Sequence, residues 1–308
     1  MSQPRAVRPN RAALIVNPLK CKTIDVRQIV STACTGEGWA ESLFLETTAD
    51  SPGVAQTRHA LSEGVDLVIA AGGDGTVRCV AQALQNTGTA LGLIPLGTGN
   101  LLARNLGLNI SNPGAAAREA LRGSDHPIDV IGAILDQDKA QQLFVVMAGL
   151  GFDAAVMADT NVNLKESLGW LAYIEAGIRK LPGRPVKASI SIDGGPASAH
   201  RLRGIMSGNC GKLQGGVEIF PGARFDDGSF DLMTLAPSGT FGWMGVLAGL
   251  LSRGRSKDPS IQYFRGKKAE ISLAKPQALQ LDGDPLGDVS HVILTIDAGA
   301  LLVRKFWP

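Results

Sequence analysis

Three short apolar runs, each ended by turn-forming residues, constrain the fold of the N-terminal part of the chain more than any other feature. They cover residues 12–16, 67–71 and 90–94, and stretches typical of helices separate them. Strands that are apolar on both faces are typical of a parallel sheet covered by helices on both sides. Residues 1–125 are therefore predicted to form an α/β domain, with a further strand at 43–45 and helices at 25–34, 53–61 and 76–84.

The pattern changes close to residue 125, and strand signals predominate from there to residue 300. Strands are predicted at 128–134, 143–148, 186–192, 202–207, 230–235, 269–273, 278–282 and 291–296. Turn sequences such as Asp193-Gly194-Gly195 separate them, and helices are predicted at 164–178 and 241–252. Residues 126–300 are therefore predicted to form a mostly β domain, and it stays open whether residues 301–308 fold back onto the first domain.

Charge and composition exclude several classes of protein. The chain has 308 residues, with 30 basic against 28 acidic side chains, and this balance is too even for a dedicated nucleic-acid binder. The four cysteines form no CxxC motif and the four histidines lack zinc-ligand spacing, so neither disulfides nor structural zinc are expected. No apolar leader is visible, and the longest apolar run, 241–251, falls short of the roughly 20 residues of a membrane-spanning helix. A soluble, cytoplasmic protein is expected.

Glycine-rich turns follow the apolar runs and are the sharpest local signal of function. The sequence GGDGT at 72–76 comes directly after one run and directly before a predicted helix, and GTGN at 97–100 follows the next run. A third turn, Asn17-Pro18-Leu19-Lys20, ends the first run. Such turns offer backbone N–H groups to phosphate oxygens beside a helix N-terminus. Asp74 would not contact phosphate, and a carboxylate there suits Mg²⁺, directly or through water.

Other nucleotide-binding and catalytic motifs are missing. The sequence has no GxxxxGK[ST], GxSxG or HExxH motif, and no GxGxxG after the first predicted strand. P-loop enzymes, hydrolases with a nucleophile elbow, zinc proteases and dinucleotide oxidoreductases are therefore disfavoured.

The GGDGT turn, followed by PLGTGNLLARNLG at 95–107, resembles the diacylglycerol kinase catalytic-domain family, which includes bacterial lipid kinases and sphingosine kinases. Further motifs occur in the family's order: AGLGFDA at 148–154, Gly208-Asn209, RFDDGSFD at 224–231 and LDGD at 281–284. GGDGT alone is shared with NAD kinases. The resemblance implies an NAD kinase/diacylglycerol kinase-like α/β nucleotide-binding domain, then a β-sandwich-like domain, with the active site in the cleft between them. It also implies ATP, Mg²⁺ and a lipid hydroxyl as acceptor.

The candidate nucleotide contacts come from the three turns and from the resemblance, which alone implies Thr47, Val77 and Arg78. They are Asn17, Pro18, Leu19, Lys20, Cys21, Thr47, Gly72, Gly73, Asp74, Gly75, Thr76, Val77, Arg78, Gly97, Thr98, Gly99 and Asn100. Two departures from the family pattern stand here. Lys20-Cys21 replaces the family's usual Ser-Gly, and Leu101 stands where many bacterial members have an acidic residue.

The resemblance also implies the catalytic and metal-binding residues. Asp284 stands at the family's catalytic glutamate and is the expected general base, with Asp282 orienting it or holding Mg²⁺. Asp74 and Asp129 complete the acidic set. A structural Mg²⁺ is implied in the later loop, held by Asp227 with the backbones of Arg224 and Ser229. From the residues alone, an ordinary turn explains Asp282-Gly283-Asp284-Pro285 better than a catalytic role does. Asp227-Gly228 fits an ordinary turn as well as it fits a metal site.

Three functions follow in order of preference. The first is an ATP- and Mg²⁺-dependent lipid kinase acting on diacylglycerol or a related lipid at the membrane surface. The second is a kinase of a soluble acceptor such as NAD, and the third is a non-catalytic nucleotide-binding regulatory protein. The apolar face of 241–251, followed by Arg253, Arg255 and Lys257, suits either a peripheral membrane contact or a helix packed on the β domain. The oligomeric state, a homodimer included, stays open.

Overall fold

The computed structural model describes residues 9–21, 24–136, 138, 140–151, 185–213, 216–251, 256 and 258–307. The chain divides into two compact units, the first holding the residues up to Pro127 together with those from Leu301 onward, and the second Ile128–Ala300. The predicted helix at 164–178 and the basic residues Arg253, Arg255 and Lys257 lie outside the described residues.

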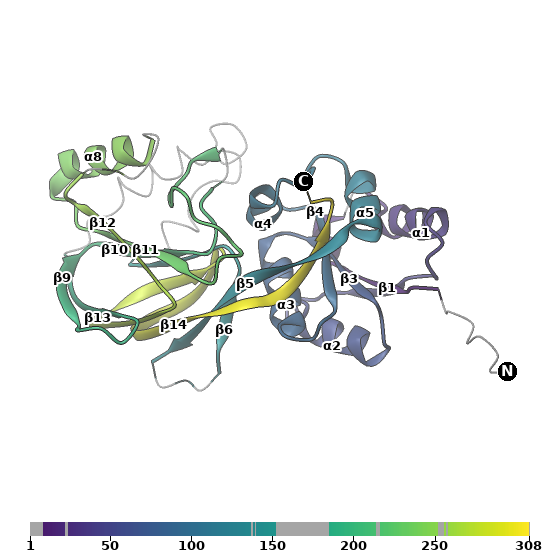
Figure 1. Cartoon of the computed structure of the whole chain (residues 1–308), viewed down its shortest axis with the longest axis horizontal. Helices are drawn as coiled ribbons and strands as arrows, with labels where there is room; N and C mark the ends of the chain where they lie inside the picture. The colour runs from purple at the N-terminus through teal and green to yellow at the C-terminus, as the bar shows by residue number, and fades with distance from the viewer. Residues whose placement is uncertain are drawn as a thin grey trace. The chain divides into compact units, whose positions relative to one another are not determined.

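The first unit is an α/β layer structure (Figure 1). Its elements are β1 (Ala12–Val16), the 3₁₀ helix η1 (Pro18–Lys20), α1 (Val26–Gly36), β2 (Leu43–Glu46), α2 (Val54–Ser62), β3 (Leu67–Gly72), α3 (Asp74–Leu84), β4 (Ala90–Pro95), α4 (Leu101–Asn105) and α5 (Pro113–Arg122). The four strands are parallel in the order β2-β1-β3-β4. The predicted parallel sheet is confirmed.

Both faces of this sheet are buried, as the continuous apolar runs require. Every residue of β1, β3 and β4 is buried. Alternate strand residues, among them Leu14 and Ile69, form one core with the apolar faces of α1 and α5. Helices α2 and α3 pack together. Because helices cover both faces of these strands, apolar side chains are favoured on both sides, while the sheet pairs the polar backbone groups. The strands therefore have no alternation of polar and apolar residues.

Two helices of this unit were not predicted. Helix α5 begins at Pro113 after Asn112, whose side chain accepts a hydrogen bond from the Ala115 N–H, which is a standard N-terminal cap. Helix α4 has only five residues and is too short to be recognised by periodicity. Helix α3 begins at Asp74, two residues before its predicted start, so the GGDGT turn itself forms the first turn of the helix.

The second unit is built from antiparallel strands around one apolar core. Its elements are β5 (Ser124–Leu135), β6 (Gln142–Phe144), β7 (Met147–Leu150), β8 (Val186–Ile192), β9 (Ser198–Leu202), β10 (Gly204–Gly208), β11 (Phe230–Leu235), α8 (Gly239–Leu251), β12 (Ile261–Gly266), β13 (Lys268–Leu281) and β14 (Asp284–Lys305). The sheet order is β12-β11-β10-β7-β13-β14, with β8 also beside β13. Strands β5 and β14 extend past the boundary, so their ends belong to the first unit. The mostly β, sandwich-like layout is confirmed.

Several strand boundaries differ from the prediction for identifiable reasons. The predicted strands 269–273 and 278–282 are one strand, β13, which ends at Leu281. A register shift between Ser272 and Gln277 interrupts the pattern without ending the strand. The predicted strand 143–148 is two strands, β6 and β7. Strands β9 and β12 were not predicted, and each carries two exposed polar residues that break up its apolar pattern.

Helix α8 corresponds to the predicted helix at 241–252. Its Trp243 and Val246 are buried, and Met244 is exposed. Burial of the first two favours packing on the β unit for that part of the helix. Within the part of the chain that the structure describes, no helix is long and apolar enough to cross a membrane.

Candidate functional site

The predicted turns of the first unit follow strand ends that the parallel sheet brings to one edge. The register pairs Val16 with Glu46 on one side and with Ala71 on the other. The residues just beyond continue the pairing, since the Thr47 N–H donates to the Val16 carbonyl and the Asn17 N–H to the Ala71 carbonyl. Ligands of open parallel sheets bind at this carboxyl edge. Along this edge the first turn therefore lies between Thr47 and the GGDGT turn.

The two glycine-rich turns pack backbone against backbone. The Leu96 N–H donates to the Gly72 carbonyl across the strand ends. A Cβ added at Gly97 would lie 2.6 Å from the Gly73 Cα, and one added at Gly72 would lie 2.6 Å from the Thr76 hydroxyl oxygen. Real Cβ atoms do not approach other atoms this closely. Gly97 is therefore needed for the close approach of the two turns, and Gly72 for the packing of Thr76 within the first of them. The approach places two sets of backbone N–H groups together.

Asp74 joins the two turns. Its Oδ2 accepts the Asn100 N–H at 2.9 Å and its Oδ1 accepts the Leu101 N–H at 2.6 Å. A Cβ at Gly99 would meet the same carboxylate at 2.5 Å. The sequence predicted a metal-linked role for Asp74. The structure gives its carboxylate backbone contacts that hold the second turn against α3.

The second turn is also held from within. Asn100 is buried and left-handed (φ 48°). Its Oδ1 accepts the Gly97 N–H at 2.9 Å and its Nδ2 donates to the Gly97 carbonyl at 2.7 Å. The Arg104 Nε donates to the Gly99 carbonyl at 2.7 Å. Arg104 was not singled out from the sequence, although LLARN follows the turn directly. Thr98, at the tip, is exposed.

The first turn is a short 3₁₀ helix capped by Asn17. Its Oδ1 accepts the Leu19 N–H at 3.0 Å, so this side chain shapes the turn. Leu19 is 72% exposed, which leaves its apolar side chain available to a ligand. Burial raises the pKa of the Cys21 thiol, with a smaller contribution from Glu46, so Cys21 is a poor nucleophile.

The remaining predicted contacts of this unit fall into two groups. Thr47, Gly72, Thr76 and Arg78 are buried. The partly exposed ones are Gly73, Gly75, Val77, Gly97, Gly99 and Cys21, and Pro18 and Lys20 are exposed. The predicted nucleotide residues therefore include both buried residues and residues that a ligand can reach.

In the second unit, the LDGD sequence is a two-residue hairpin turn between β13 and β14. Leu281 pairs with Asp284, and the two central residues are left-handed, Asp282 at φ 49° and Gly283 at φ 91°. Asp-Gly favours this turn because both positions need positive φ. An ordinary turn and a functional role are therefore compatible for this sequence, because the turn fixes the position of Asp284 at the start of β14.

Asp282 is 4% exposed and binds backbone. Its carboxylate accepts the N–H groups of Val145, Val146 and Met147 at 2.8, 2.9 and 2.9 Å. Three such bonds lock the hairpin to the β6–β7 connection. Of the two predicted roles, orienting Asp284 fits these contacts. Asp284 itself is half-buried.

Asn209, which was not chosen as a functional residue, holds the same connection from its other side. Its Nδ2 donates to the Asp129 carbonyl at 2.7 Å and to the Val145 carbonyl at 3.1 Å. Beside it, burial raises the pKa of the Cys210 thiol, and Asp282 raises it further. The Gly208-Asn209 motif was the available signal.

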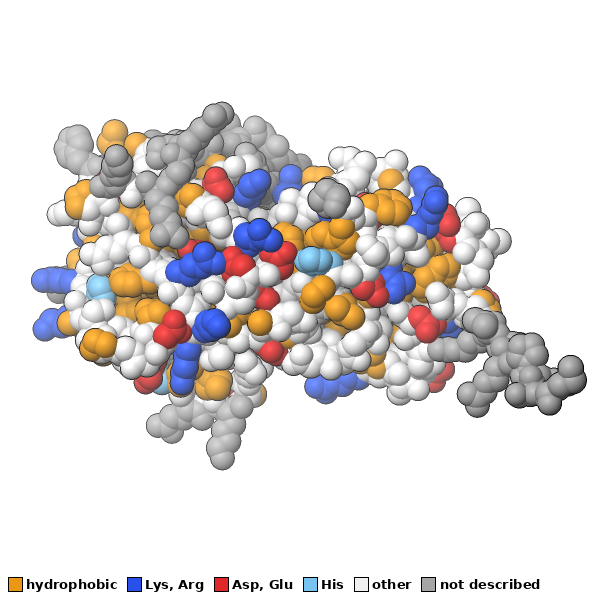
Figure 2. Space-filling view, in the orientation of Figure 1, with side chains coloured by type: hydrophobic (Ala, Val, Ile, Leu, Met, Phe, Trp, Pro, Cys, Tyr) orange, Lys and Arg blue, Asp and Glu red, His pale blue; other side chains and the backbone are white. Residues whose placement is uncertain are grey.

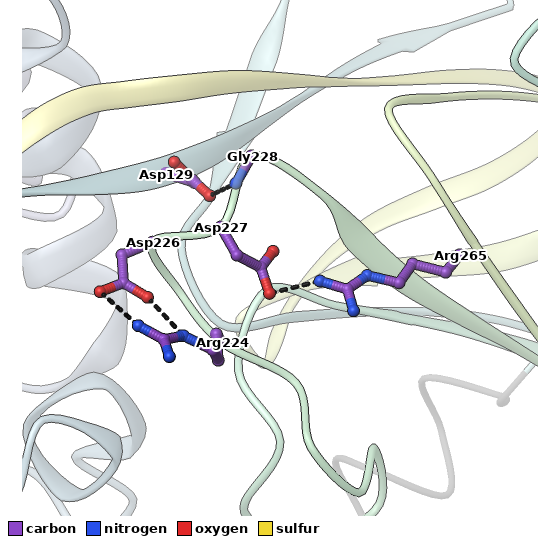
Figure 3. Close-up of polar contacts among 6 residues, drawn as sticks. All are labelled: Asp129, Arg224, Asp226, Asp227, Gly228 and Arg265. Atoms are coloured by element: carbon purple, nitrogen blue, oxygen red, sulfur yellow. Dashed lines mark hydrogen bonds and ion pairs between the residues drawn. The ribbon is translucent and has the colours of Figure 1, made fainter.

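Asp129 is 2% exposed and binds both the loop that holds Gly228 and strand β14 of the second unit. Its Oδ2 accepts the Gly228 N–H at 2.6 Å and its Oδ1 the Gly299 N–H at 2.8 Å. Figure 3 shows its carboxylate directed at the Gly228 amide. These contacts give Asp129 a structural role. A part in the chemistry stays a prediction.

The predicted metal loop carries two arginine–carboxylate pairs (Figure 3). The Arg224 Nε lies 3.1 Å from the Asp226 Oδ1, and Arg265, which the sequence did not suggest, pairs with the Asp227 Oδ2. Hydrogen bonding to these carboxylates raises the pKa of both guanidinium groups. On the visible face, basic and acidic side chains are intermixed (Figure 2). The Asp227 Oδ1 is buried and has no hydrogen-bond partner among the described residues.

That orphaned oxygen bears on whether a cation fits here. Mg²⁺ takes one or two carboxylates with other oxygen ligands and waters. The loop offers the Asp227 Oδ1, with the backbone carbonyls of Arg224 and Ser229 close in sequence. No cluster of three or more His, Cys, Asp or Glu side chains able to hold a metal occurs among the described residues. The donors of this loop fit a Mg²⁺ site with a single carboxylate ligand, and they do not fit a site that needs several carboxylates.

Comparisons with known proteins agree on one family. Residues 11–133 match the diacylglycerol kinase catalytic domain, and residues 145–304 match the YegS C-terminal NAD kinase beta sandwich-like domain. The chain is 30% identical to the diacylglycerol kinase of Bacillus subtilis, covering 89% of each protein. It is 34% identical to a Pseudomonas fluorescens protein described as "probable lipid kinase YegS-like", covering 96% of this chain and 95% of that one.

Solved structures show the same fold. A diacylglycerol kinase from Bacillus anthracis superposes with a TM-score of 0.72 at 20% identity, covering 97% of this chain and 98% of that one. An NAD kinase from Archaeoglobus fulgidus in complex with ATP superposes more distantly, with a TM-score of 0.53 at 13% identity over 96% of this chain and 93% of that one.

Proposed function

Because the chain belongs to the diacylglycerol kinase family, and is therefore a phosphotransferase with an alcohol group as acceptor, we propose that its donor is ATP with Mg²⁺. The proposed acceptor is the free hydroxyl of diacylglycerol or a related lipid. The observation that carries the proposal is the paired glycine-rich turns of the first unit, packed backbone to backbone and joined through Asp74.

The paired turns support a triphosphate ligand on physical grounds. Phosphoryl transfer depends on positioning and charge neutralisation more than on covalent chemistry. The proposed donors are the backbone N–H groups at the start of α3 and those of Thr98 and Gly99, because the Gly97 and Asn100 N–H groups donate to the Asn100 and Asp74 side chains. Donors fixed in this way lose little entropy on binding phosphate oxygens. Asn17 and Thr47, at the other strand ends of the same edge, are the proposed contacts to the nucleoside.

Mg²⁺ would neutralise charge on the phosphates and orient the terminal phosphoryl group. Asp74 is the proposed residue near this ion. A second, structural Mg²⁺ is proposed at Asp227, supported by its orphaned buried oxygen. Because Arg265 already pairs with the other oxygen of Asp227, this site would hold its ion with only part of a carboxylate's charge.

Asp284 is the proposed general base. A carboxylate that takes the proton of an acceptor hydroxyl must reach that hydroxyl. Asp284 is half-buried and begins β14 directly after a rigid two-residue turn. Aspartate is one methylene shorter than the family's glutamate, so the proposal requires the acceptor to approach this turn more closely. The acceptor, being a lipid, would be met at a membrane surface.

The test is transfer of label from [γ-³²P]ATP to lipid vesicles containing diacylglycerol, followed by separation of the organic and aqueous phases. Label in the organic phase is the expected result for the wild-type chain. Asp284→Asn should reduce transfer by about 100-fold or more, since general-base catalysis contributes roughly 10²–10⁴-fold. Asp288→Asn is the matched control, because Asp288 is exposed on the same strand and should leave transfer unchanged.

Each other result has a definite meaning. Label that stays in the aqueous phase on a soluble acceptor such as NAD would replace the lipid with that acceptor. ATP binding without any transfer would favour the non-catalytic nucleotide-binding reading. Full transfer by Asp284→Asn would remove Asp284 as the base while leaving the kinase activity in place.

A further inference from the structure

The last residues of the chain bind the first unit through a series of specific contacts. The Arg304 guanidinium makes two hydrogen bonds to the Asp125 carboxylate, at 2.5 and 2.8 Å. The Phe306 N–H donates to the Glu119 Oε1 at 3.1 Å, and the Trp307 Nε1 donates to the Ser124 carbonyl at 2.9 Å. These bonds fix the end of β14 on either side of Lys305.

Lys305 is the member of this series that points into the protein. It is 7% exposed, and its Nζ donates to the Leu106 carbonyl at 2.6 Å. The same Nζ lies 4.6 Å from the centre of the Trp307 ring, within the range of a cation–π contact. Its backbone is also tightly enclosed, since a Cβ added at Gly123 would lie 2.4 Å from the Lys305 carbonyl carbon.

The carbonyl that Lys305 binds ends a helix. Leu106 is the C-terminal cap of α4, and its own N–H donates to the Leu102 carbonyl. Helix C-termini carry unpaired carbonyls and partial negative charge, and a lysine there satisfies both. A helix of five residues has little stability of its own. Helix α4 therefore depends on what holds its two ends.

The other end of α4 is the second glycine-rich turn. Asp74 accepts the N–H groups of Asn100 and Leu101 there, and Lys305 binds the opposite end at Leu106. We infer that Lys305 is a positioning residue for the 97–100 turn, so that this one C-terminal side chain forms part of the nucleotide-binding apparatus. This inference rests on the proposed binding of ATP by that turn.

The chemistry of the contact argues for this role over simple packing. Burying an ammonium group costs free energy unless it is hydrogen-bonded, and an apolar side chain would fill the same space without that cost. The guanidinium hydrogen bonds of Arg304, the neighbouring cation, go to the carboxylate of Asp125. Arg304 therefore anchors the C-terminal residues, whereas Lys305 supports the turn. Substituting each residue in turn separates the two effects.

The experiment measures binding of ATP with Mg²⁺ by calorimetry on the full chain, with KM values for ATP and for diacylglycerol vesicles. Lys305→Met keeps the length of the side chain and removes its charge and donors. We expect its affinity for ATP to fall about tenfold, with the KM for diacylglycerol unchanged. Lys305→Arg should restore most of the affinity. Arg304→Met, which removes the adjacent cation, should bind ATP within about twofold of wild type.

Exchange of backbone amide hydrogens gives a second readout, measured on a different substitution of Lys305. Lys305→Gln keeps an N–H donor without charge, and amides of 97–106 should exchange faster in it than in wild type, while those of α1 stay unchanged. Unaltered ATP affinity and exchange in the Lys305 variants would overturn the inference. Equal losses in Lys305→Met and Arg304→Met would also overturn it, by assigning the effect to the whole C-terminus. A wild-type chain that does not bind ATP would instead refute the proposed function.

Discussion

Gly97→Ala tests the packing of the two glycine-rich turns most directly. The added methyl carbon would lie 2.6 Å from the Gly73 Cα and 2.8 Å from the Asn100 Oδ1. Both neighbours are fixed, the first because it is backbone and the second because it accepts the Gly97 N–H. No flexible side chain can turn away to make room, so the turns themselves must separate.

The size of the effect follows from these distances. Non-bonded carbon atoms sit at about 3.5–4.0 Å, so the turns must separate by about 1 Å. Overpacking of this kind typically costs about 1–3 kcal/mol of stability. Misplacement of binding groups by about 1 Å costs about 100-fold in rate. We therefore expect kcat/KM for ATP to fall about 100-fold, while the free energy of unfolding falls by no more than ~3 kcal/mol.

The assay combines ATP kinetics with urea unfolding, and Gly36→Ala is the matched control. Gly36 lies in α1 of the same unit, and a Cβ there would meet no atom within 4 Å. The control should retain wild-type kinetics and equal or greater stability. Wild-type ATP kinetics in Gly97→Ala at unchanged stability would refute the argument that close contact between the turns forms the phosphate site.

Two further predictions concern Asp282, in the hairpin that carries Asp284, and the buried Cys210, whose pKa Asp282 helps to raise. Asp282→Asn puts a donor where three backbone N–H groups need acceptors, so the free energy of unfolding measured in urea should fall by about 2–4 kcal/mol. The control Asp288→Asn should lose less than ~0.5 kcal/mol. Equal small losses in the two variants would contradict the anchoring role of Asp282. The raised pKa of the buried Cys210 thiol keeps it protonated in the folded state, while the unfolded thiol ionises near 9.0. Wild-type stability should therefore be retained below that pH and fall above it, relative to Cys210→Ala, by up to ~1.4 kcal/mol per pH unit. Parallel pH profiles of the two chains would contradict this.

The sequence was sufficient to predict the parallel sheet of the first unit, though not helices α4 and α5, because the signals of the sheet are local. Apolar runs such as 67–71 have to be strands covered on both faces, and the glycines that end them have to be turns. Adjacent strand ends then bring GGDGT and GTGN together without any further information. The contact between Gly73 and Gly97 is a consequence of that topology.

The roles of individual polar residues were harder to predict because they depend on partners far away in sequence. Asp282 binds backbone at 145–147, and Lys305 binds Leu106 across 199 positions. Neither partner is a side chain, so no pattern of residue types marks it. A backbone N–H or carbonyl has the same chemistry at every position, and only the fold determines which of them an aspartate or lysine meets.

The four aspartates predicted to carry the chemistry divide by their burial. Asp129 and Asp282 are nearly inaccessible, and their carboxylates accept backbone N–H groups. Taking a proton from a substrate would require breaking those bonds and opening the surrounding structure. Asp74 and Asp284 are only partly buried, so a substrate or an ion can reach them. Substitution of the first pair should therefore act through stability and backbone order, whereas substitution of Asp284 should act on phosphoryl transfer itself. Substitution of Asp74 should act on both, because its carboxylate also accepts two backbone N–H groups of the second turn.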